Sequence, residues 1–189
     1  MNWDDLFPMV RKFAASAPKS VLRQSLRESA RSFCDESRAW RTTGYEWLHA
    51  GVDRYEIRPP GGADAALVAV PALGVDGSAL SENGDYWIEA GEVVLRRTPE
   101  KSGQLEYTAA WMPTVKARGL PDAIGERWGD VIGHGAAARL AEIPGKTWSS
   151  PETAQYHWRR YRSGVSQALS AEMKGGTDRS LTVKPRRFV

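Results

Sequence analysis

The stretch PKSVLRQSLRESARSFCDESRAWRTTGYEWL (18–48) contains the change of pattern that decides the fold. Its first part predicts a helix over about residues 18–38, because apolar or small side chains recur every three or four positions and charged ones fill the other faces. This stripe comprises Leu22, Leu26, Ala30, Phe33 and Ser37. Pro18 suits a first helical turn. From about residue 42 the helical spacing is lost, which indicates a different kind of structure.

Strands are predicted over about residues 42–112. This region consists of short runs rich in Val, Ile, Tyr and Trp that are separated by Gly, Pro, Asn and Asp, a pattern typical of strands and turns. We interpret it as five or six antiparallel strands. Within it, Tyr86 to Arg96 is expected to form a hairpin that turns near Ala90–Gly91.

Helical patterns flank this insert on both sides. Residues 3–13 carry apolar side chains at helical spacing, although Pro8 limits their regularity, and two further helices are expected at about 121–142 and 151–173. About six residues connect the last two helices, which therefore should form an antiparallel hairpin. The predicted fold class is α+β: an antiparallel bundle of about four helices, with an antiparallel β insert between the second and third.

The start and inner face of the last predicted helix are defined by particular residues. Ser150 is expected as its N-cap, with Pro151 in the first turn; an alternative frame makes Ser149 and Glu152 a capping box. Its apolar face is expected to comprise Ala154, Trp158, Tyr161, Val165 and Leu169. Arg159, Arg160 and Arg162 should lie on the opposite, exposed side.

The chain closes with KGGTDRSLTVKPRRFV, which divides it into a domain at 1–174 and an extended arm at 175–189. The net charge is +3, yet from Lys174 onward five cations face one anion, so the preceding residues sum to about −1. We expect the arm to dock on a neighbouring molecule, as an added strand or along a groove; the alternative is a tail without a docking role. The docking residues would be Leu181, Val183, Lys184, Arg186, Arg187 and Phe188.

The cysteine content indicates the kind of compartment in which the protein folds. Cys34 is the only cysteine, so an intrachain disulfide is impossible and folding in a reducing compartment is expected, with Cys34 a buried thiol. The N-terminus MNWDDLFP lacks the basic region of a signal peptide, and no run of 18 apolar residues occurs to span a membrane.

Motifs for catalysis or cofactor binding are weak. Gly145-Lys146-Thr147 ends like a phosphate-binding loop, but position 140 is Leu where that loop requires glycine, so we interpret it as a loop between helices. The three histidines have no metal-ligand spacing. We therefore expect no catalytic residue, no metal and no cofactor.

Two sets of residues are candidates for close packing. Gly125, Gly129 and Gly133 repeat every four positions on one predicted helix. Each glycine costs roughly 1 kcal/mol of helix propensity, which is explained if another chain segment approaches closely, either within the fold or from a second subunit. Most of the eight tryptophans should anchor the core and the others should serve interfaces. Trp158 and Tyr161 are candidates for a subunit contact or for close helix packing. The tryptophans of or beside predicted elements are Trp40, Trp47, Trp87, Trp111, Trp128, Trp148 and Trp158.

Parts of the sequence resemble the head-to-tail connector proteins of tailed bacteriophages, also called adaptor or neck proteins. The likeness lies in DLFPMV, followed by a proline-led helix with SARSFCDESRAWR, and in AAWMPTVKARGLPDAIGERWGDVIGHGAAARLAEIPGKTWSSPETAQYHWRRYRSGV. It covers most of the chain and is weakest over about 60–105 and in the arm. None of these motifs contains a catalytic residue.

The resemblance implies a virion structural protein at the head–tail junction. Such a protein would form a ring of about twelve copies between the portal protein and a tail, nozzle or tail-terminator protein, and DNA would pass through its channel. Two other classes stay open: a non-specific DNA-binding module acting in packaging or assembly, and an enzyme whose site the sequence does not reveal.

Overall fold

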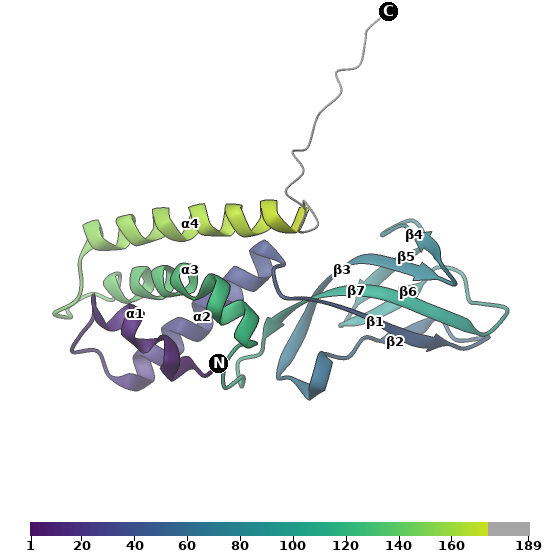
Figure 1. Ribbon diagram of the computed structural model, residues 1–189, viewed down its shortest axis with the longest axis horizontal. Coiled ribbons are helices and arrows are strands. Elements are labelled where there is room, and N and C mark those ends of the chain that lie inside the picture. The colour runs from purple at the N-terminus through teal and green to yellow at the C-terminus, as the bar shows by residue number, and fades with distance from the viewer. Residues whose placement is uncertain (174–189) are drawn as a thin grey trace, which may run out of the picture.

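Figure 1 shows the computed structural model, which describes residues 1–173, with helices at one end and strands at the other. A 3-10 turn η1 (Trp3–Leu6) and helices α1 (Phe7–Arg11) and α2 (Lys19–Ser37) precede seven strands, and helices α3 (Asp122–Ala141) and α4 (Pro151–Met173) follow them. The predicted α+β class is confirmed, as is the placement of the strands between the second and third helices. None of the helices in residues 1–173 is long and apolar enough to cross a membrane.

Helix α2 has the inner face that the sequence predicts. All five residues of the stripe from Leu22 to Ser37 are fully buried, and so is Cys34. The helix ends where Arg38 adopts a left-handed conformation (φ 53°) and its N–H bonds the carbonyl of Cys34, which is a common way to terminate a helix. Burial raises the pKa of the Cys34 thiol to about 12, consistent with an inert buried thiol.

The N-terminal segment differs from the single helix expected over 3–13. It consists of η1 and the five-residue α1, in which Pro8 occupies the first turn. Proline can begin a helix but cannot continue one, so the segment divides near Pro8. Phe13 lies beyond the end of α1 and is 42% exposed. The expected antiparallel bundle of about four helices is therefore not what the structure shows. Three long helices, α2, α3 and α4, pack on one another, and the short segment packs on α3.

The strands form two antiparallel sheets. The larger has the order β1-β7-β3-β4 and the smaller the order β2-β6-β5, so seven strands replace the five or six expected. The strands are β1 (Arg41–Leu48), β2 (Arg54–Glu56), β3 (Ala65–Val75), β4 (Ser78–Leu80), β5 (Tyr86–Glu89), β6 (Glu92–Leu95) and β7 (Gly103–Pro113). Strand β1 pairs with β7 without interruption, whereas the pairing of β3 with β7 shifts register between Leu67 and Ala72.

The hairpin predicted at Tyr86–Arg96 is confirmed as β5 and β6. Its two turn residues, Ala90 and Gly91, have φ values of 53° and 86°. Positive φ at both positions defines the tight turn that matches the twist of paired strands. Glycine adopts this conformation freely, but alanine does so at a cost.

One hydrophobic core joins the helices to the sheets. Trp111 of β7 is buried between them; its main-chain N–H bonds the carbonyl of Trp40 at 2.8 Å, and its indole donates to the Thr42 hydroxyl at 2.8 Å. From α2, Arg31 donates to the carbonyl of Pro113 at 2.6 Å. The end of β7 is thus fixed to α2 through both packing and hydrogen bonds.

Candidate interaction surfaces

The glycine stripe of α3 packs inside the molecule. A Cβ at Gly129 would lie 3.1 Å from Cδ2 of Leu6, one at Gly133 would lie 3.2 Å from Cβ of Met9, and one at Gly125 would overlap the side chain of Met1. The segment that approaches this stripe is therefore the protein's own N-terminal segment. Of the two alternatives for these glycines, the structure shows packing within the fold.

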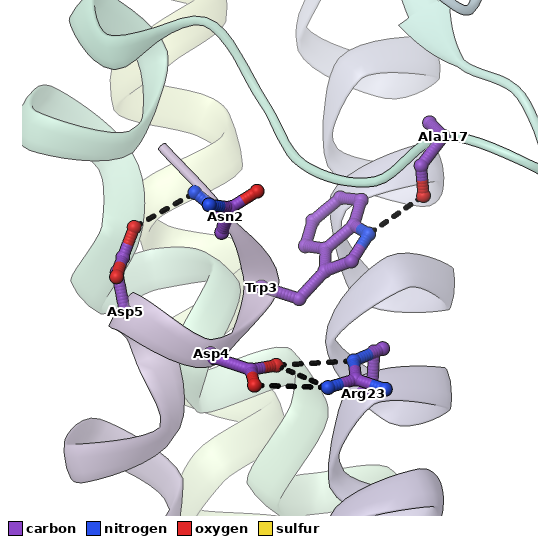
Figure 2. Close-up of polar contacts among 6 residues, drawn as sticks. All are labelled: Asn2, Trp3, Asp4, Asp5, Arg23 and Ala117. Atoms are coloured by element: carbon purple, nitrogen blue, oxygen red, sulfur yellow. Dashed lines mark hydrogen bonds and ion pairs between the residues drawn. The ribbon is translucent and has the colours of Figure 1, made fainter.

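Polar contacts hold the N-terminal segment in place, as Figure 2 shows. The indole of Trp3 donates to the carbonyl of Ala117 at 2.8 Å, and the guanidinium of Arg23 on α2 binds both carboxylate oxygens of Asp4 at 2.6 and 2.9 Å. Asp5 accepts a bond from the main-chain N–H of Asn2. The segment thus bridges α2 and the loop that leads into α3.

The contact between α3 and α4 involves two glycines outside the predicted stripe. At Gly164 of α4 a Cβ would lie 2.5 Å from Cγ1 of Val131 on α3, and at Gly135 of α3 one would lie 2.7 Å from the ring of Tyr161. Both distances are too short for a real side chain. Helices α3 and α4 therefore approach closely because these positions lack a side chain.

Trp158 and Tyr161 of α4 both contact the neighbouring helices. Tyr161 is buried, and burial together with the nearby Glu36 raises the pKa of its hydroxyl. Trp158 is half-buried and donates to the carboxylate of Glu142 at 2.7 Å, at the end of α3. The structure thus places both residues in contacts within the chain.

The buried face of α4 is rotated from the one predicted. Its buried residues are Ala154, His157, Tyr161, Gly164, Val165 and Ala168. Leu169, expected on this face, is exposed, because Gly164 brings α3 to its own side of the helix. The N-cap is Ser150, whose hydroxyl accepts from the N–H of Thr153. As predicted, Arg159, Arg160 and Arg162 are exposed.

A pair of histidines lies between α3 and α4. The Nδ1 atoms of His134 and His157 are 2.7 Å apart, and Phe13 packs edge-on against the His157 ring. Burial and the neighbouring His134 lower the pKa of His157 to about 4; burial and Arg160 lower that of His134. Nε2 of His157 is buried and has no hydrogen-bond partner among residues 1–173. Sequence reasoning missed this pair, although an antiparallel hairpin brings together positions equally distant from its connecting loop.

The outer face of the larger sheet is the main exposed aromatic surface of the strands. Tyr45 is 69% and Trp47 60% exposed, and both project from the same side of β1, since alternate residues share a face. Next to Tyr45 is a shallow depression of about 660 Å³ floored by small residues of β3 and β4, among them Ala72, Gly74 and Ala79. Trp47 thus belongs to the minority of tryptophans that lie outside the core.

The six docking residues predicted in the arm lie outside the described residues. These are Leu181, Val183, Lys184, Arg186, Arg187 and Phe188. The described part of α4 runs to Met173, and its Glu172 forms an ion pair with Arg41, the first residue of β1, at 3.4 Å.

No protein-family model and no curated protein matches the chain.

Proposed function

We propose that the protein is a structural subunit of the head-to-tail connector of a tailed bacteriophage. In this role, about twelve copies form a ring that binds the portal protein on one side and a tail, nozzle or tail-terminator protein on the other, and DNA passes through the central channel. The proposal rests on the resemblance of DLFPMV, the α2 sequence and the PGK-x-W-S loop to those proteins.

The observation that carries the proposal is the packing together of the resembling segments. The DLFPMV segment lies on α2 and α3 through Asp4, Leu6 and Met9, and the Lys146–Trp148 loop is joined to the same region by a bond between Thr147 and Ser16 at 2.9 Å. Segments that resemble one family and occupy one packed unit support a common origin for that unit. The exposed Tyr45 and Trp47 add a surface suited to binding a partner.

The decisive test locates the protein in the particle. Cryo-electron microscopy of the phage that encodes it should show a ring of this fold between portal and tail, and removal of its gene should give DNA-filled heads that do not acquire tails. Density for this fold anywhere else in the virion would refute the proposal. A monomer in solution would not, since ring formation can require the portal as a template.

The arm gives a second test of the same function. We expect a variant lacking residues 175–189 to fold and yet to attach poorly to portal-bearing heads, because Arg186, Arg187 and Phe188 would supply charged and apolar contacts to the adjacent ring. Undiminished attachment would refute a docking role for the arm.

A non-specific DNA-binding module is the second candidate, favoured by Arg159, Arg160 and Arg162 on the exposed side of α4. Against it, the charges of residues 1–173 sum to about −1. DNA sliding through a ring must not be held tightly, so we expect the isolated protein to bind duplex DNA weakly. Tight binding with a steep dependence on salt would instead favour the module.

A further inference from the structure

Strand β1 has one free edge in the described structure. All eight of its residues pair with β7, and no strand within residues 1–173 pairs with its other side. Its sequence, RTTGYEWL, contains neither proline nor lysine, two residues that commonly prevent an edge from pairing. The unpaired N–H and C=O groups of this edge can therefore accept a further strand.

The side chains along this edge indicate what such a strand must carry. Thr43, Tyr45 and Trp47 share the outer face, and the two aromatic rings are largely exposed. An added strand would place every second side chain beside them, and apolar side chains there would form favourable cross-strand pairs. A strand with alternating apolar and polar residues is required.

Acidic side chains lie near the second half of strand β1. Glu46 lies on β1 itself, and Glu106 of β7 is exposed directly opposite Tyr45. The nearby cation of β1, Arg41, is engaged by Glu172. A basic segment beside Tyr45–Leu48 would therefore be attracted.

The ion pair between Arg41 and Glu172 also places the end of α4 at the start of β1. From Met173, the six residues 174–179 can span about 20 Å when extended, while β1 is about 27 Å long. The next four residues, Ser180-Leu181-Thr182-Val183, alternate polar and apolar side chains, and Lys184, Arg186 and Arg187 follow them.

We propose that in the unassembled protein Ser180–Val183 of the same chain pairs with the free edge of β1 as a fifth strand. It runs in the direction of β1, because the chain leaves α4 beside Arg41, the first residue of that strand. Leu181 and Val183 lie on the face of Tyr45 and Trp47, and Lys184, on the opposite face of the added strand, comes beside Glu46. The edge is then covered until a partner competes for the arm. This inference does not depend on the proposed function.

Hydrogen exchange of the β1 amides tests the pairing. In the full chain, Thr182→Pro removes a donor from the added strand, and Thr177→Pro makes the same substitution before it. We expect the amides of residues 43–48 that point away from β7 to exchange at least about tenfold faster in Thr182→Pro and unchanged in Thr177→Pro. Unchanged exchange of α2 amides would show that both variants are folded.

Two outcomes would overturn the proposal. Equal exchange in the full chain and in Thr182→Pro would show that the arm does not cover β1. Protection that grows with protein concentration between about 1 and 100 µM would show that the arm comes from a second copy. Protection independent of concentration supports pairing within one chain.

Discussion

At the residue scale, Gly164 controls how closely α4 approaches α3. A methyl group there would overlap the branched side chain of Val131, which has little freedom to move within a helix. We expect Gly164→Ala to lower the free energy of unfolding by about 1–3 kcal/mol, since overpacking outweighs the gain in helix propensity. Chemical denaturation measures this change. Ser163→Ala, at the exposed neighbouring position, is the matched control; equal stability of both variants would contradict the prediction.

His157 makes the helix pair sensitive to acid. Its pKa of about 4 in the folded protein lies below the ordinary value of 6.5, so the unfolded chain binds the proton more tightly. The free energy of unfolding is therefore highest above pH 6.5, and it falls by about 2–3 kcal/mol as the pH is lowered toward 4. Unfolding measured between pH 7 and 4 should show a smaller loss in His157→Gln than in the wild type. Parallel pH profiles would exclude this effect.

At the scale of the elements, the turn between β5 and β6 contains a strained residue. Ala90 adopts a φ of 53°, a conformation that costs about 1–2 kcal/mol for a residue with a side chain. We expect Ala90→Gly to raise the melting temperature modestly, because relief of this strain exceeds the added entropy of the unfolded chain. Gly91→Ala, with a φ of 86° in the same turn, should lower it. A lower melting temperature in both variants would refute the account.

Some elements of the fold can be predicted from the sequence, and others cannot. Helix α2 and the Tyr86–Arg96 hairpin are encoded locally, by a helical stripe and by a glycine turn, and both are confirmed. The division of the strands into two sheets depends on pairings between distant segments, such as β1 with β7, which local patterns do not specify. The buried face of α4 differs from the predicted one because Gly164 contributes little to an apolar pattern, yet its lack of a side chain is what lets α3 approach. The contact between His134 and His157 can be predicted only when the alignment of α3 with α4 is known.

At the scale of the whole molecule, the helices and sheets should unfold together. Trp111 lies in the single core that they share, and its contacts with Trp40 and Thr42, with the bond from Arg31 to Pro113, join the two ends. We therefore expect a single transition, in which the helical signal at 222 nm and the near-ultraviolet tryptophan signal change at the same temperature.

Substitution of Trp111 tests whether the two ends unfold together. Trp111→Ala removes a large side chain of the shared core and should lower the free energy of unfolding by about 3–5 kcal/mol, as buried aromatic truncations do. The helical signal at 222 nm should then fall at the same lowered temperature as the near-ultraviolet tryptophan signal. Trp87→Ala removes a partly exposed tryptophan of β5 and should leave the transition nearly unchanged. If the helices of Trp111→Ala kept the wild-type melting temperature while the sheets melted early, the two ends would be independent folding units joined by a passive contact. The burial of Trp111 against residues 40–42 predicts the opposite.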